Sequence, residues 1–386
     1  MKTLLESDVF YKVGAPLAIA LGRDVSGNPL VADPARMPHL LIAGATGSGK
    51  SVCITAIAAC LAMNNTPEEL RMVMIDSKMV ELIRFNGLPH LYGKVETDLN
   101  RIMGVLRWVV VEMEHRYRLL ESAHTRDVNS YNKKMARSAS GQPLPRIVVM
   151  VDELADLMMS APGQTEHNLV RLAQMARATG IHLVVATQRP STDVVTGLIK
   201  ANFPARLAFA VASGIDSRVI LDYTGAESLL GRGDMLFLNP EVGGPIRAQG
   251  ALITDMEIER IIAHWQKVTE TTKIEAPPWE KLLQEPGEDE DDGLVEQAVA
   301  IVRQQQRASA SMLQRRLRIG YPRAARLLDR FRRDGRGRSR RRVAARSAKC
   351  SSARMTKFPE LGMKSEDSFR DVRDAASIPR CKNPKS

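Results

Sequence analysis

With 386 residues, 44% of them apolar, the chain is long enough for two or three domains with sizeable cores. No apolar run of about 18 residues occurs, charges interrupt the first residues, and the spacing of the four cysteines suits neither a zinc site nor a disulfide framework. We therefore expect no membrane span, no secretory signal and a reducing, cytoplasmic location. The net charge of +11 permits a polyanionic partner without requiring one.

Residues 1–30 are predicted to form a short, partly extended adapter, and residues 31–270 a larger α/β domain. In the larger segment, short apolar runs alternate with helical stretches such as 99–121 and 166–179. Strands covered by helices on both faces are typically continuous apolar runs, so this pattern predicts a mainly parallel sheet. Its strands are expected at residues 39–43, 72–76, 147–152, 182–187, 206–211 and 234–238.

The stretch GATGSGKS (44–51) fits the phosphate-binding pattern G-x-x-x-x-G-K-[ST]. It lies between a predicted strand (39–43) and a predicted helix (51–63), so bound phosphates would lie at a helix N-terminus. Lys50 is expected to contact the β- and γ-phosphates of ATP, and Ser51 to hold Mg²⁺. The residues predicted to bind nucleotide are Gly44, Ala45, Thr46, Gly47, Ser48, Gly49, Lys50 and Ser51.

A second nucleotide signature lies in RIVVMVDELADLMM (146–159), where an apolar run ends in Asp152 and Glu153. An acid at the end of a strand beside the phosphate loop can position Mg²⁺, and the acid that follows can polarise the attacking water. The two acids therefore predict hydrolysis as well as binding.

Polar residues near the next predicted strand extend this site. Gln188 follows the run HLVVAT and is placed to contact the γ-phosphate and the attacking water, although it could equally cap the strand. Arg171 and Arg177 lie on the preceding helical stretch. A guanidinium supplied by a neighbouring subunit could neutralise charge in the transition state, whereas by sequence alone either arginine could be an ordinary surface residue.

The C-terminal part of the chain changes in character. Residues 271–293 are Pro-rich and then acidic, and are predicted to be a linker. Residues 294–335 contain three short helical stretches with turns typical of a helix-turn-helix. Residues 336–386 are rich in Arg, Ser and Lys without periodicity, and are predicted to be a disordered basic tail.

The motifs together resemble the FtsK/SpoIIIE family of bacterial DNA translocases. The resemblance covers about residues 15–265 and includes MIDSKMVEL (74–82), LPHLYGKV (88–95) and DSRVILDYTGAESLLGRGDML (216–236). It also includes the phosphate loop, the acid pair and the segment 176–209. The unit at 294–335 resembles the small C-terminal winged-helix domain of the family.

This resemblance implies a RecA-like, ATP- and Mg²⁺-dependent motor that forms a hexameric ring on double-stranded DNA and moves it during chromosome segregation at cell division. Family members are often anchored at the inner membrane and the division septum. By position, Gln188 matches the sensor, Arg177 the arginine finger between subunits, and Lys200 a lysine that senses nucleotide. Residues 189–197 match a loop that faces the DNA, which implies contacts from Arg189 and Thr192. In the winged-helix unit, DNA contacts are expected from Arg315, Arg316, Arg323 and Arg326.

The chain also departs from the family pattern. Ser77 replaces the proline of a common Asp-Pro-Lys, Gly214 replaces a lysine, and Pro322 replaces an asparagine. An Arg-rich stretch stands where the two-stranded wing is expected, so we expect only weak DNA sequence preference. The chain could be a fragment or a soluble paralogue.

Two further functions remain open from the sequence. One is an FtsK-like ATPase that moves proteins in a secretion machine, and the other is a degenerate protein that binds DNA without translocating. A single phosphate loop and the unit at 294–335 favour the DNA motor over the first. Intact Lys50, Asp152 and Glu153 argue against the second.

Overall fold

The computed structural model describes residues 1–138, 141–269, 276–284, 298, 301–302, 309–317 and 324. It consists of two compact units, residues 1–293 and residues 294–386. Within the described residues, no helix is long and apolar enough to cross a bilayer.

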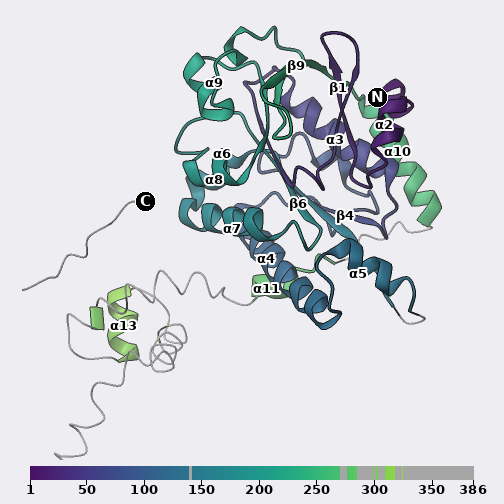
Figure 1. Cartoon of the computed structure of the whole chain (residues 1–386). Coiled ribbons are helices and arrows are strands. Elements are labelled where there is room, and N and C mark those ends of the chain that lie inside the picture. Colours follow the sequence, from purple (N-terminus) through teal and green to yellow (C-terminus); the bar gives the residue numbers. More distant parts are fainter. Residues whose placement is uncertain are drawn as a thin grey trace, which may run out of the picture. The chain divides into compact units, whose positions relative to one another are not determined.

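The first unit alternates helices and strands along most of its length (Figure 1). Its strands are β1 (Ile19–Asp24), β2 (Pro29–Ala32), β3 (His39–Ala43), β4 (Leu70–Ile75), β5 (Arg146–Val151), β6 (Ile181–Thr187), β7 (Ala205–Phe209), β8 (Asp234–Leu238) and β9 (Pro245–Gly250). Its α-helices are α1 (Lys2–Leu5), α2 (Asp8–Val13), α3 (Lys50–Asn64), α4 (Leu99–Ser122), α5 (Val128–Met135), α6 (Leu154–Ser160), α7 (Pro162–Met175), α8 (Gly197–Asn202), α9 (Gly214–Leu221), α10 (Asp255–Thr269) and α11 (Glu280–Gln284). Two 3₁₀ turns are η1 (Ile83–Phe85) and η2 (Ala226–Ser228).

The nine strands form one sheet in the order β2-β1-β9-β8-β7-β3-β6-β5-β4. The five strands from β4 to β7 in this order are parallel to one another, which confirms the predicted parallel core. The other strand pairs are antiparallel. Because parallel strands end at the same edge, the loops after β3, β4, β5 and β6 all meet at one side of the sheet.

The strand predicted at 234–238 is β8, and it is the one predicted strand whose neighbours, β7 and β9, are both antiparallel to it. Residues 239–244 alone connect β8 to β9, and so short a connection can join only antiparallel neighbours. The N-terminal segment also contributes to this sheet. β1 pairs with β9 and with β2, so residues 19–32 extend the sheet beyond the predicted boundary at residue 30.

Helices cover both faces of the sheet, and the strands alternate their side chains between two cores. Leu40 and Ile42 of β3 pack in the core that contains α3 and α10, while Leu41 and Ala43 pack in the core that contains α4 and α7. Both faces are apolar because both are covered, which explains why the central strands are continuous apolar runs.

Residues 276–284, predicted to lie in a linker, pack against α4 of the first unit. Trp279 is fully buried beside Trp108, with ring centroids 5.4 Å apart, and its indole N–H donates to Glu96 at 2.8 Å. A Cβ at Gly104 would lie 2.3 Å from a methyl carbon of Leu283, so the glycine leaves room for this segment. We call residues 276–284 the strap.

In the second unit the structure describes one helix with defined bounds, α13 (Ala310–Leu317), and a small apolar cluster. Leu313 is buried there with Ala298 and Ala324. This cluster matches the predicted helical unit, whose remaining residues lie outside the described ones.

Candidate nucleotide-binding site

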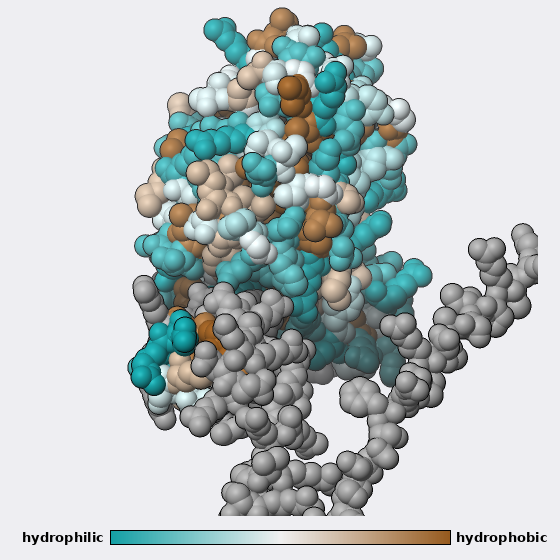
Figure 2. Space-filling view, turned by 90° about the vertical axis from the view of Figure 1, so that its left-hand side faces the viewer, coloured by the Kyte–Doolittle hydropathy of each residue, from teal (hydrophilic) through white to brown (hydrophobic). Residues whose placement is uncertain are grey.

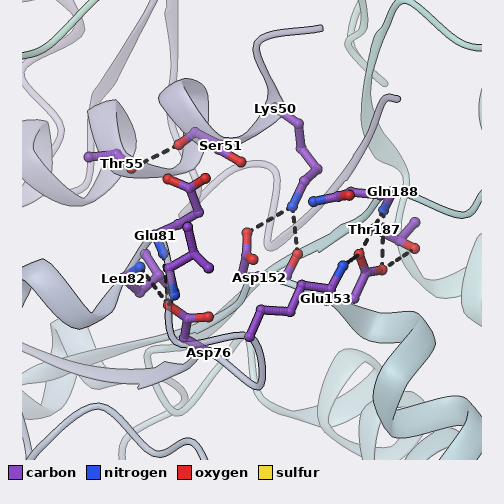
Figure 3. A network of polar contacts seen from close by, with 12 residues as sticks. Lys50, Ser51, Thr55, Asp76, Glu81, Leu82, Asp152, Glu153, Thr187 and Gln188 are labelled. Carbon is purple, nitrogen blue, oxygen red and sulfur yellow. Dashed lines mark hydrogen bonds and ion pairs between the residues drawn. The ribbon is translucent and has the colours of Figure 1, made fainter. Parts of the chain in front are cut away.

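The predicted phosphate loop, acids and sensor converge at the carboxyl edge of the parallel strands. The loop 44–49 follows β3, Asp152 and Glu153 follow β5, and Gln188 follows β6. Figure 3 shows Lys50, Asp152, Glu153 and Gln188 pointing toward one another from these elements. The sheet topology therefore brings together residues that are more than one hundred positions apart in the sequence.

The loop has the geometry that its glycines permit. Gly47 and Gly49 have φ values of +77° and +116°, a region that side chains rarely occupy. A Cβ at Gly49 would lie 2.6 Å from the backbone nitrogen of Gly233, and one at Gly44 would lie 2.6 Å from Phe209. Helix α3 begins at Lys50, so its first N–H groups face the loop.

A cavity of about 690 Å³ lies at this loop. Its lining joins the loop to Gln188, to residues 249–252 and to the cations Arg84 and Arg232. Its volume, the start of α3 in its lining and the glycine turn fit a nucleoside triphosphate. Ser51 lies in the same lining, which supplies a hydroxyl where a divalent cation would sit beside the phosphates.

Lys50 and Asp152 form a buried ion pair in this structure. The Lys50 ammonium donates to the Asp152 carboxylate and to the Asp152 carbonyl, both at 2.7 Å. Burial, together with the nearby carboxylates of Asp76 and Glu153, raises the pKa of Asp152 by more than Lys50 lowers it. Lys50, the residue expected to bind phosphate, therefore holds Asp152 close to the phosphate loop.

Glu153 caps the N-terminus of α6, where its carboxylate accepts a hydrogen bond from the backbone of Ala155. Oε1 also accepts from the Thr187 hydroxyl at 2.7 Å, and Oε2 accepts from the Lys78 ammonium at 2.7 Å. Burial raises the pKa of Glu153, but the hydrogen bonds from Lys78 and Thr187 outweigh it, so the net pKa is lowered. The carboxylate is therefore ionised and fixed at neutral pH.

Gln188 links the phosphate loop to Glu153. Its side-chain oxygen accepts from the Thr46 hydroxyl at 3.0 Å, and its backbone N–H donates to both Glu153 oxygens at 3.1 and 3.2 Å. Because Gln188 contacts both the phosphate loop and Glu153, its position fits a sensor of nucleotide bound at the loop.

Arg177 and Lys200 lie at the opposite edge of the sheet. Arg177 is exposed in the turn before β6, after α7 has ended at Met175, so the predicted helix 166–179 was too long at its C-terminus. Lys200 lies before β7 and its ammonium contacts Asp222 at 2.6 Å. Because β6 has seven residues, roughly 20 Å separates the two edges. The structure thus brings neither cation to the phosphate loop of its own chain.

The predicted DNA contacts are surface residues where the structure describes them. Arg189 and Thr192 are exposed in the loop between β6 and α8, and Arg315 and Arg316 are exposed on α13. Arg323 and Arg326 lie outside the described residues.

The loop after β4 contains contacts that the sequence did not indicate. One oxygen of the buried Asp76 carboxylate accepts N–H groups from Val80, Glu81 and Leu82 at 2.9–3.1 Å. The Ser77 hydroxyl donates to Asp156 at 2.6 Å, a bond that the proline common in the family cannot make. The sequence signal that could have indicated Asp76 is its place as an acid directly after the apolar run of β4.

Comparison with known proteins gives two family matches. Residues 1–192 match the FtsK/SpoIIIE family, and residues 289–343 match the Ftsk gamma domain. The chain is 54% identical over 318 residues to the DNA translocase FtsK of Oceanobacillus iheyensis, covering 81% of this chain and 40% of that protein. It is 49% identical over 335 residues to the DNA translocase SftA of Bacillus subtilis, covering 87% of this chain and 35% of that protein. The chain thus spans about a third to a half of the length of these relatives.

Solved structures agree with the fold. The pCW3 conjugation coupling protein TcpA, determined as a monomer with ATPγS, aligns with a TM-score of 0.56 and 29% identity, covering 64% of this chain and 70% of that one. The cytoplasmic domain of the type VII secretion ATPase EccC of Thermomonospora curvata aligns with a TM-score of 0.58 and 24% identity, covering 64% of this chain and 31% of that one.

Proposed function

The chain belongs to the FtsK/SpoIIIE family, and on that premise we propose that it hydrolyses ATP to drive movement along double-stranded DNA in chromosome segregation. The observation that carries this proposal is the hydrogen-bonded arrangement in which Lys50 contacts Asp152 and Gln188 contacts Glu153, with Lys50 and Gln188 lining one cavity (Figure 3). A site that only bound nucleotide would not need the buried, ionised carboxylate of Glu153 beside Gln188, the residue that contacts the phosphate loop.

Each residue has a distinct role in the proposed reaction. The loop N–H groups and Lys50 bind and orient the β- and γ-phosphates. Glu153 accepts the proton of the attacking water, and Gln188 orients that water. Ser51 and Asp152 are the residues that would hold Mg²⁺, which when bound neutralises charge on the phosphate oxygens.

We propose that the active assembly is a homo-hexameric ring, with Arg177 acting on the ATP of a neighbouring subunit. The support is geometric, since Arg177 lies exposed at the edge opposite to its own phosphate loop. Figure 2 shows the side of the molecule that carries α7, α8 and α9, where apolar groups lie among hydrophilic ones. Leu198 of α8 and Ile215 of α9 are exposed apolar residues that a neighbouring subunit would cover. Lys200 lies at the same edge as Arg177, and we assign its nucleotide contact to the neighbouring subunit too.

We assign DNA binding to two regions. Arg189 and Thr192 supply the contacts from the motor loop, and Arg315, Arg316, Arg323 and Arg326 supply those from the gamma domain. Guanidinium groups bind phosphates bidentately and carry no base information unless they enter a groove, so the main effect is affinity that depends on salt.

The relatives favour DNA over protein as the moved substrate. Relatives at 49–54% identity are named DNA translocases, whereas the secretion ATPase is 24% identical and supports the fold alone. The proposed site of action is the cytoplasm, at the septum where the chromosome is divided.

ATP turnover with and without long duplex DNA tests this function. We expect DNA to stimulate turnover, Lys50→Ala to abolish it, and Glu153→Gln to bind ATP but hydrolyse it at least about a hundredfold more slowly. Wild-type turnover by Lys50→Ala would remove the phosphate-loop assignment. Loss of nucleotide binding in Glu153→Gln would show that Glu153 has a structural role instead.

A further inference from the structure

Lys78 makes a direct contact with the proposed catalytic base. Its ammonium lies 2.7 Å from Oε2 of Glu153, although the two residues are 75 positions apart. The Glu153 side chain is 1% exposed and that of Lys78 is 37% exposed, so the lysine reaches from the surface to a buried carboxylate. The contact that the structure gives the Lys78 ammonium is therefore with the base itself.

The loop that carries Lys78 is rigidly built. The Asp76 carboxylate gathers the N–H groups of residues 80–83, which closes the loop on itself. Met79 adopts a left-handed conformation with a φ of +56°, an arrangement that a β-branched residue would strongly disfavour. This geometry aims Ser77 and Lys78 at the same neighbouring helix.

Ser77 and Lys78 contact the start of α6 at two points. The Ser77 hydroxyl donates to Asp156 at 2.6 Å, while Lys78 contacts Glu153, which caps that helix. The loop after β4 is therefore clamped onto the segment that presents the catalytic carboxylate. We call this pair of contacts the base clamp.

We propose that Lys78 is a positioning residue for Glu153, and that Ser77 and Lys78 together hold the carboxylate in the orientation needed to take a proton from water. This inference rests on the proposed function, because it assigns a supporting residue to the same hydrolytic site. Lys78 holds Oε2, Thr187 holds Oε1, and the Gln188 backbone N–H contacts both oxygens, so the carboxylate is fixed from two sides.

The physical reason is the cost of a buried charge without partners. Without Lys78, Oε2 would keep only the Gln188 backbone contact at 3.2 Å, and the carboxylate would turn toward solvent to recover hydrogen bonds. A misplacement of about 1 Å at a reacting group can reduce a rate about a hundredfold, whereas ATP binding depends on the loop and Lys50 and should persist.

A double-mutant cycle on the full chain tests this inference, with single-turnover hydrolysis of radiolabelled ATP as the readout. We expect Lys78→Met to lower the rate at least about tenfold in the wild-type background and less than about twofold in the Glu153→Gln background. The KM for ATP should change less than about threefold. Lys78→Arg should recover most of the rate, Ser77→Ala should lose less than Lys78→Met, and Lys12→Met, which removes an exposed charge from α2, should match wild type.

Three results would overturn the inference. Lys78→Met could lower the rate equally in both backgrounds, leave it unchanged, or raise it, and the last would mean that the contact restrains the base. If Glu153→Gln is inactive while Lys78→Met behaves as wild type, only the positioning role fails. If Glu153→Gln retains the wild-type rate, the base assignment fails as well.

Discussion

Replacing Trp279 with alanine is expected to release the strap from α4 while the sheet stays folded. Trp279 is the one fully buried side chain among the described residues of the strap. Removing a buried tryptophan typically costs about 3–5 kcal/mol. Its N–H bond to Glu96 is lost as well, which leaves a buried acceptor with one partner fewer.

The other strap contacts are too weak to compensate. The pair between Arg101 and Glu280, at 2.9 Å, is largely exposed to solvent, which screens the attraction between the two charges. Leu283 is only half-buried, and ordering each residue of the strap costs about 1–2 kcal/mol. The lost tryptophan contacts therefore exceed what the remaining contacts supply, and the strap should undock locally.

Hydrogen exchange measured by mass spectrometry checks this expectation. Peptides covering residues 276–284 should be protected in the wild type and exchange at nearly the unprotected rate in Trp279→Ala. Peptides from β3, β5 and β6 should keep their protection, and the control Glu280→Gln should leave the strap protected. A strap that stays protected in Trp279→Ala, or a sheet that loses protection together with it, would refute the reasoning.

Three further predictions concern stability, assembly and DNA binding. Burial lowers the pKa of His39 to about 3 and those of His90 and His182 to about 4, so these side chains stay neutral in the folded protein. The free energy of unfolding should therefore fall as the pH drops from about 6.5 toward 4. An unchanged urea midpoint between pH 7 and pH 5 would contradict this. Arg177→Ala mixed with Lys50→Ala should recover part of the ATPase activity, because mixed interfaces pair an intact loop with an intact arginine; no recovery in assemblies shown to contain both chains would count against an action in trans. Arg315→Ala combined with Arg316→Ala should weaken duplex binding about equally for random and G-rich sites and reduce the slope of log affinity against log salt by up to about two, and a loss confined to one sequence would show base recognition instead.

The parallel half of the sheet and its site could be predicted because their signals are local. Continuous apolar runs gave β3, β5 and β6, and each polar site residue directly follows such a run or lies in the glycine loop. In a parallel sheet, all strands end at the same edge. Residues that directly follow these strands in the sequence therefore lie close together in the structure.

The remaining features depend on contacts that no local pattern contains. β2 has only four residues, and most side chains of β9 are exposed or half-buried, so both lack the apolar run that marked the central strands. The direction of β8 follows from its pairing with β9 and not from its composition. The contact of Lys78 with Glu153 joins residues 75 positions apart, and Trp279 lies in a Pro-rich, acidic region whose composition predicts a linker.

Displacement of a triplex-forming strand from linear duplex DNA tests most directly the claim that ATP hydrolysis drives movement along DNA. The account predicts displacement by the full chain with ATP and Mg²⁺, none with ATPγS, and none by Glu153→Gln at concentrations where that variant still binds DNA and ATP. Turnover that DNA stimulates without any displacement, or displacement that persists in Glu153→Gln, would contradict a translocase powered by this site.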